Sequence, residues 1–199
     1  MTPDDQQASL HRRTVLRYAV AMLAAPTTLV AGCDRGGGGM PMMGASSASA
    51  MPGWMMNDGM MDAAMMADMQ VIMDLLTNHQ AVRRTVEDVD GGIVSQTTSS
   101  DPRIAGLIAS HVAAMKTRIE QNHPVRQGDP LFREIFKHHA DIRITVEPLP
   151  DGVRVTETST DPQVTLLIRQ HARAAVSQFV ADGMSRAMQP TPLPNGYRG

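Results

Sequence analysis

The sequence is poor in the groups on which several classes of protein depend. Its 199 residues include one cysteine, Cys33, which excludes an intrachain disulfide, a zinc site built from several cysteines and a covalently attached c-type haem. No Ser/His/Asp constellation, acidic pair or phosphate-binding loop can be placed in it, so we do not expect an enzyme. Acidic and basic residues nearly balance, which gives no indication of a nucleic-acid partner.

No apolar run is long enough to span a membrane. The most apolar stretch lies in HRRTVLRYAVAMLAAPTTLVAGC, residues 11–33, and contains about a dozen such residues before it is interrupted. A basic stretch, a short apolar run and then small residues form the three-part layout of a secretory signal. The sequence therefore predicts a signal peptide over residues 1–32.

Two short motifs refine this prediction. Residues 30–33, VAGC, resemble the lipobox of bacterial lipoproteins, in which the cysteine is acylated and becomes the new N-terminus. Arg12 and Arg13 open the run RRTVLR, which resembles the twin-arginine export motif, although Val15 stands where that motif prefers phenylalanine. These resemblances imply export in a folded state and a lipid anchor on Cys33, at the periplasmic face of a membrane in the bacterial envelope.

Residues 33–57 are rich in glycine, serine and methionine. This composition predicts a flexible tether, because the segment has too little apolar surface to offset its chain entropy. About twenty residues of this kind reach roughly 25 Å, enough to hold a domain clear of a membrane.

The folded part, predicted over residues 58–188 with a methionine-rich leading helix, repeats itself with an offset of 60 residues. LLTNHQAVRRTVEDVDGGIVSQTTSSDPRIAGLIASHVAAM aligns without a gap on IFKHHADIRITVEPLPDGVRVTETSTDPQVTLLIRQHARAA. We interpret this as an internal duplication, with repeats over about residues 71–119 and 131–179. Residues 189–199, which begin with QPTPLP, are predicted to be a disordered tail.

Each repeat contains the same predicted elements: an apolar helix, two strands joined by a glycine-containing turn, and a helix begun by Asp-Pro. We therefore predict an α+β fold in which two tandem helix-hairpin-helix repeats form one pseudo-twofold domain. Its four-stranded antiparallel sheet is covered by helices. The pattern HxxIRxTVE, TETSxDP and LIxxH also resembles uncharacterised exported bacterial proteins, which implies no activity.

Four histidines occupy equivalent positions in the two repeats. His111 and His171 fall on the apolar faces of their predicted helices, whereas His79 and His139 end the preceding helices. The ring nitrogens of a buried imidazole need partners. In one interpretation these partners are carbonyls or carboxylates, to which the histidines make hydrogen bonds. In the other, the histidines converge near the pseudo-twofold axis and bind a metal or a haem iron.

Methionine is concentrated ahead of the repeats, with twelve of the fifteen methionines after residue 32 lying between positions 40 and 73. From Met61 to Met73 they recur every four residues, which places them on one helix face, where packing alone would explain them. Those in the predicted tether have no core to fill. Thioethers favour Cu(I), and the segment is similar to methionine-rich segments of periplasmic copper-handling proteins. The predicted metal ligands are Met55, Met56, Met60, Met61, Met65, Met69, His79, His111, His139 and His171.

We therefore expect an envelope lipoprotein that binds or buffers a metal ion, with copper as the leading candidate. One alternative is a haem-binding domain with His111 and His171 as axial ligands. The other is a non-catalytic structural or partner-binding lipoprotein, in which the histidines only support the core.

Overall fold

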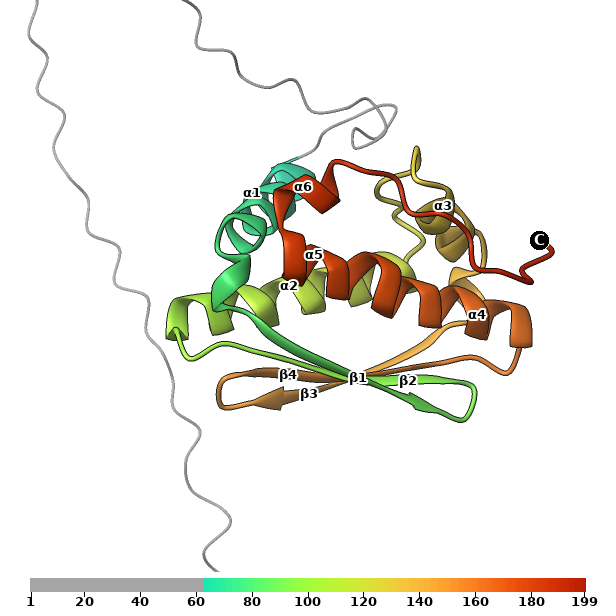
Figure 1. Cartoon of the computed structure of the whole chain (residues 1–199), viewed down its shortest axis with the longest axis horizontal. Coiled ribbons are helices and arrows are strands. Elements are labelled where there is room, and N and C mark those ends of the chain that lie inside the picture. Colours follow the sequence, from blue (N-terminus) through green and yellow to red (C-terminus); the bar gives the residue numbers. More distant parts are fainter. Residues whose placement is uncertain (1–62) are drawn as a thin grey trace, which may run out of the picture. The chain divides into compact units, whose positions relative to one another are not determined.

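The computed structural model describes residues 63–199 (Figure 1). The predicted signal peptide over residues 1–32, with Arg12 and Arg13, and the predicted tether over residues 33–57, with Cys33, lie outside this part of the chain. The predicted copper ligands Met55, Met56, Met60 and Met61 also lie outside it. Between residues 63 and 199, none of the helices combines the length and apolar character needed to cross a membrane.

The described chain forms a four-stranded antiparallel sheet with helices, so the predicted α+β class and its sheet are confirmed. In chain order the elements are α1 (Ala63–Thr77), the 3₁₀ turn η3 (His79–Ala81), β1 (Arg83–Val89), β2 (Gly92–Thr98), α2 (Pro102–Glu120), α3 (Pro130–Lys137), η4 (His139–Asp141), β3 (Arg143–Leu149), β4 (Gly152–Thr158), α4 (Pro162–Gln170), η5 (His171–Ser177), α5 (Gln178–Asp182) and α6 (Met184–Ala187). The segment η5 is π-helical and joins α4 to α5.

An aspartate followed by a proline begins each of the helices α2, α3 and α4. Asp101, Asp129 and Asp161 have extended backbones, and their side chains accept hydrogen bonds from amides of the first helical turn. The proline that follows lacks an amide hydrogen at a position where none is needed. The Asp-Pro pairs therefore fix where these helices start.

The strands are arranged in the order β1-β2-β4-β3, so the two hairpins meet between β2 and β4. Ser95 lies opposite Val155 at the middle of this junction. At its two ends, a Cβ atom on Gly92 or Gly152 would fall 1.9 Å or 2.1 Å from a carbonyl oxygen of the facing strand. Glycine at these two positions is what permits the hairpins to approach so closely.

The helices cover one face of the sheet, with α2 and the α4–η5–α5 run next to it and α1, α3 and α6 farther out (Figure 1). Ile104 and Ile108 of α2 share a buried cluster with Val155 of β4. Val164 of α4 shares another with Ile93 of β2. Each helix thus buries its apolar face against a strand of the other hairpin, so neither half completes a core alone.

The C-terminal residues return over the helices. The final helical run is interrupted at Gly183, with φ +58°, and α6 ends at Ala187. Residues 189–199, for which the sequence predicts a disordered tail, make specific contacts: the hydroxyl of Tyr197 donates to Glu134 Oε2 at 2.7 Å. This hydrogen bond lowers the pKa of Glu134, and burial together with it raises the pKa of Tyr197 to about 12.

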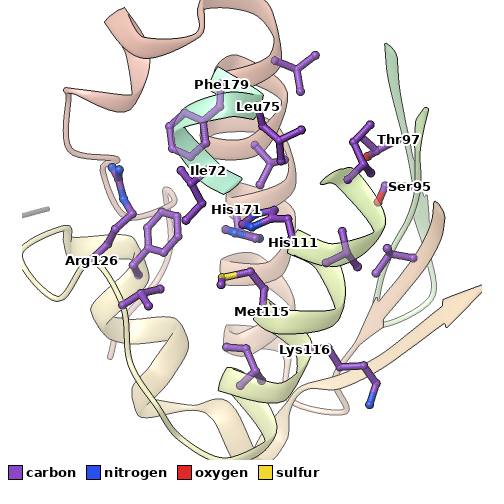
Figure 2. Close-up of a pocket in the computed structure, with 18 of the residues that line it drawn as sticks. Ile72, Leu75, Ser95, Thr97, His111, Met115, Lys116, Arg126, His171 and Phe179 are labelled. Atoms are coloured by element: carbon purple, nitrogen blue, oxygen red, sulfur yellow. The ribbon is translucent and has the colours of Figure 1, made fainter. Parts of the chain in front are cut away.

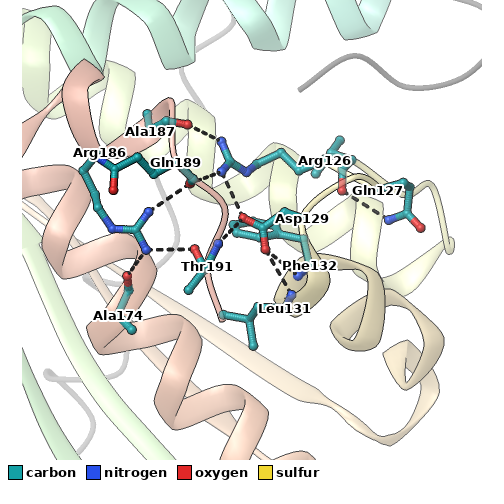
Figure 3. A network of polar contacts seen from close by, with 11 residues as sticks. Arg126, Gln127, Asp129, Leu131, Phe132, Ala174, Arg186, Ala187, Gln189 and Thr191 are labelled. Atoms are coloured by element: carbon teal, nitrogen blue, oxygen red, sulfur yellow. Dashed lines mark hydrogen bonds and ion pairs between the residues drawn. The ribbon is translucent and has the colours of Figure 1, made fainter. Parts of the chain in front are cut away.

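A polar network fastens the same tail to the start of α3 (Figure 3). Asp129 is fully buried, pairs with Arg126 at 3.1 Å and accepts a hydrogen bond from the Thr191 amide at 2.9 Å. The Arg126 guanidinium lies over the rings of Phe132 and Phe179, 4.9 and 5.2 Å from their centroids. A buried carboxylate is tolerated here because it is both paired and hydrogen-bonded.

Candidate functional site

A cavity of about 270 Å³ lies between the helices and the sheet. Apolar side chains form most of its wall, and all four strands contribute residues to it. His111 of α2 and His171 of η5 project into it, and the sulfur of Met115 is directed toward the same space (Figure 2). A positive charge on His111 would lower the pKa of His171, and the close-up view draws the two rings next to each other (Figure 2).

Helical periodicity explains how both histidines reach the cavity. His111 follows the buried Ile108 by one turn on the inward face of α2, and Met115 follows His111 by another. His171 stands where α4 passes into the π-helical η5. Such segments are rare and occur often at functional sites, because the wider turn changes the direction of the side chains that follow.

Both imidazoles are neutral at physiological pH. Burial lowers the pKa of His111 to about 4, with partial opposition from Asp68. Burial also lowers the pKa of His171 to about 4, and the positive charge of Arg84 contributes to the shift. His171 Nδ1 lies 3.9 Å from Glu157 Oε2, but because the imidazole is neutral the two groups do not form an ion pair at neutral pH.

The cavity leaves one histidine nitrogen unsatisfied. Among the described residues, His111 Nδ1 is buried and has no hydrogen-bond partner. The ring of His171 meets that of Phe132 edge-on, with centroids 5.3 Å apart and planes at 81°. A buried polar atom without a protein partner is unusual, so this nitrogen is noteworthy in the wall of a cavity.

Three thioethers line the same cavity. Met65 and Met69 belong to α1, and Met115 belongs to α2. The first two were predicted as metal ligands, whereas Met115 was not. The structure therefore brings soft sulfur donors from two helices into one chamber with the two imidazoles.

The remaining two predicted histidines are occupied elsewhere. His79 Nδ1 donates to the carbonyl of Val180 at 2.9 Å, although the ring also lines the cavity. His139 Nδ1 donates to the carbonyl of Ile119 at 3.1 Å and is not among the residues that line the cavity. For these two the structural interpretation fits better, since each fastens a turn to a helix.

Polar residues on the inner face of the sheet form the floor of the cavity. They are Arg84, Ser95, Thr97 and Glu157. An arginine in the inward-facing series of a strand was the one sequence signal for this floor, because the strand period places Arg84 with Val82 and Val86. None of these four residues was predicted as part of the site.

No group of three or more His, Cys, Asp or Glu side chains within residues 63–199 is placed to hold a metal ion. A metal in the cavity would therefore depend on two imidazoles supplemented by thioether sulfur. This donor set differs from the carboxylate and multi-histidine sets that suit Mg²⁺, Ca²⁺ or Zn²⁺.

Comparison with known proteins gives the chain no family. No family model matches it, and neither the curated proteins nor the solved structures include a significant match. Its function must be inferred from the cavity and the sequence.

Proposed function

We propose that the protein is an exported, membrane-anchored copper-binding protein that holds Cu(I) in this cavity, with His111 and His171 as nitrogen ligands and Met115 as a sulfur ligand. The observation that carries the proposal is the meeting of two neutral imidazoles and several thioethers in one apolar chamber. Met65 and Met69 provide further sulfur atoms along the wall formed by α1.

The protonation state of the histidines supports metal binding. A histidine binds a metal through a deprotonated ring nitrogen, so a proton competes with the metal. Because the pKa of each of the two imidazoles is about 4, protons do not compete at neutral pH. The unpartnered Nδ1 of His111 gives a metal one nitrogen that no protein group already uses.

The surroundings favour a soft ion of low charge. Transfer of an ion from water into an apolar chamber becomes more costly as its charge increases, which disfavours divalent ions. The positive charges of Arg84 and Arg126 disfavour further positive charge at His171, and they repel a divalent ion more strongly than a monovalent one. Thioether sulfur selects Cu(I), whereas imidazole alone would suit several metals.

An internal duplication would explain why two equivalent histidines meet. Ser95 and Val155, which correspond under the 60-residue offset, are also paired directly between β2 and β4. Exchange of the two repeats would turn each residue of this pair into the other, so the pair would map onto itself. We therefore infer that the pseudo-twofold axis of the two repeats passes through it. His111 and His171 correspond under the same offset and would approach a shared ion from opposite sides of this axis.

Haem remains the alternative occupant for the same histidines, but the size of the chamber favours a smaller one. A cavity of about 150 Å³ holds benzene, so 270 Å³ suits a ligand of about ten non-hydrogen atoms rather than a porphyrin. Haem would require the helices around the cavity to separate. A purely structural or partner-binding lipoprotein, the third candidate, would leave the unpartnered His111 Nδ1 unexplained.

The N-terminal sequence completes the proposal. A lipid on Cys33 would anchor the protein in the bacterial envelope, and Met55, Met56, Met60 and Met61 would collect Cu(I) near the folded domain. With α1 carrying Met65 and Met69 to the cavity, the methionine-rich segment and the histidines would act as one copper-buffering system.

The test is an anaerobic Cu(I) titration of the mature protein against a competing chelator, followed by the same titration of variants. The double variant His111→Leu/His171→Leu removes both imidazoles, and we expect at least a tenfold loss of affinity. His123→Gln is the matched control, because His123 is exposed in the connector after α2. A Soret absorption band after addition of haemin, lost in the double leucine variant, would instead favour haem.

A second variant separates the two sets of methionines. Leucine at Met55, Met56, Met60 and Met61 preserves apolar volume and removes the thioethers, a swap that costs under about 1.5 kcal/mol even in a core. We expect this variant to bind fewer Cu(I) ions while the tightest site is retained. Retention of full Cu(I) binding by the double histidine variant would exclude the cavity as the copper site.

A further inference from the structure

The floor of the cavity carries unsatisfied donors that copper binding does not use. Arg84 of β1 donates from Nη1 to Thr97 Oγ1 at 2.6 Å, but its Nε is buried and has no hydrogen-bond partner among the described residues. The Ser95 hydroxyl on the neighbouring strand is likewise buried and unpartnered, with the residue only 2% exposed. Both residues line the cavity. Two donors without acceptors, on neighbouring strands of the same cavity floor, are what a bound acceptor group would satisfy.

The charge on this floor favours an anion. Arg84 makes no ion pair within 4.0 Å among the described residues, and Glu157 on β4 acts on it only from a longer distance. The other two cationic side chains in the lining already have partners, since Arg126 pairs with Asp129 and Lys116 with Glu120. Arg84 is therefore the cation in the lining without a close counter-ion, and a carboxylate is its natural acceptor.

The volume of the cavity exceeds what an ion needs. A Cu(I) ion between imidazole and thioether ligands occupies little of about 270 Å³. On the scale set by benzene in about 150 Å³, the space accommodates roughly ten non-hydrogen atoms. Apolar side chains from the sheet and the helices, including Ile144, Val155 and Val180, face this space.

We propose that the cavity is also a binding site for a compact apolar monocarboxylate, whose carboxylate accepts hydrogen bonds from Arg84 Nε and Ser95 Oγ while its apolar body lies among the apolar side chains of the cavity wall. The polar floor determines the orientation of the ligand, and the apolar walls limit its size to about one aromatic ring with a short substituent. Carboxylate binding depends on the floor residues and not on the copper ligands, so it can be tested separately from copper binding.

The test uses benzoate as the probe and benzyl alcohol as its neutral counterpart, with metal-free mature protein. Isothermal titration should show one saturable benzoate site per chain, with at least tenfold weaker binding of benzyl alcohol. We expect Arg84→Gln to weaken benzoate binding at least tenfold and Ser95→Ala several-fold. Arg83→Gln is the matched control, because Arg83 is exposed on the opposite face of the same strand.

Two results would contradict the proposed carboxylate site, and a second variant keeps the test possible. If Arg84→Gln fails to fold because a buried cation is removed, Ser95→Ala removes a single oxygen atom and still tests the floor. Benzoate binding that is no tighter than that of benzyl alcohol would overturn the proposal. Equal losses in Arg83→Gln and Arg84→Gln would also overturn it, since the loss would then come from charge in general and not from the cavity floor.

Discussion

His111 and His171 line one cavity, although they lie 60 residues apart and belong to different helices. Both rings are neutral because burial lowers their pKa to about 4. Two apolar side chains in these positions would stabilise the core more than two imidazoles do, because each buried imidazole loses its hydration. The proposed Cu(I) ion, bound by both rings, would explain why the two imidazoles occur together in one apolar cavity.

The first prediction concerns the stability of the metal-free protein as the pH falls. A histidine has a pKa near 6.5 when unfolded, so between pH 6.5 and 4 the unfolded chain binds more protons at these two positions than the folded chain does. The free energy of unfolding should therefore decrease over this window, by up to about 1.4 kcal/mol per pH unit for each histidine. Urea unfolding at half-unit intervals of pH measures it.

The double variant His111→Leu/His171→Leu provides the control for this effect. Glu157 acts in the opposite sense, because burial raises its pKa and the folded state then takes up its proton first as the pH falls. Subtraction of the variant's pH profile from that of the wild type isolates the histidine contribution. Parallel profiles in the two proteins would mean that neither histidine is buried as a neutral group.

The second prediction concerns the fully buried Asp129. Replacement by alanine leaves the Arg126 guanidinium without its carboxylate and removes the acceptor for the Thr191 amide, so we expect a loss of about 3–5 kcal/mol. Asp161→Ala is the matched control, because Asp161 caps α4 with the same Asp-Pro geometry and makes no ion pair within 4.0 Å with another residue between 63 and 199. It should cost about 1 kcal/mol. Equal losses in urea unfolding would show that only the helix cap matters.

The third prediction concerns the close contact between the hairpins. Gly92→Ala and Gly152→Ala each place a Cβ atom within 2.1 Å of a carbonyl oxygen, so each should destabilise the domain by about 3 kcal/mol or more. Gly106→Ala should stabilise it by up to about 1 kcal/mol, since Gly106 lies inside α2 with open space around it. Thermal unfolding distinguishes these cases. Tolerance of alanine at both junction glycines would contradict the observed β2–β4 pairing.

The fourth prediction concerns the anchor. Cys33→Ala should release the exported protein from membranes without changing the stability of residues 63–199, because acylation of that cysteine is the proposed attachment. Fractionation after a high-salt wash, together with thermal unfolding of the released protein, measures both effects. A variant that still sediments quantitatively with membranes would exclude the lipoprotein proposal.

The fold class could be predicted because its signals are local. Strand alternation around Val86, the Asp-Pro pairs and the short hairpin turns each act over a few residues, and they place the elements where the structure has them. The tail after Ala187 was harder to predict, since its prolines exclude regular structure without excluding packing. The hydrogen bonds from the Thr191 amide to Asp129 and from the Tyr197 hydroxyl to Glu134 each span more than 60 positions of the chain, which no local pattern indicates.

The candidate site could be predicted only in part. The inward position of His111 and His171 follows from helical periodicity, but the cavity that they share depends on how α2, η5 and the sheet pack together. The role of Arg84 was missed: the strand period places it with Val82 and Val86, but the cavity that it lines is formed only when the helices cover the sheet. Met115 was missed as a ligand because one methionine on an apolar face is more often packing.

X-ray absorption spectroscopy of the mature protein, loaded anaerobically with one equivalent of Cu(I), identifies the ligands of the bound ion. We expect a Cu(I) ion with two imidazole nitrogens at about 2 Å and thioether sulfur at about 2.3 Å, and loss of the nitrogen shell in His111→Leu/His171→Leu. A spectrum that contains sulfur ligands alone, identical in wild type and variant, would contradict it and assign copper to the methionine-rich segment instead.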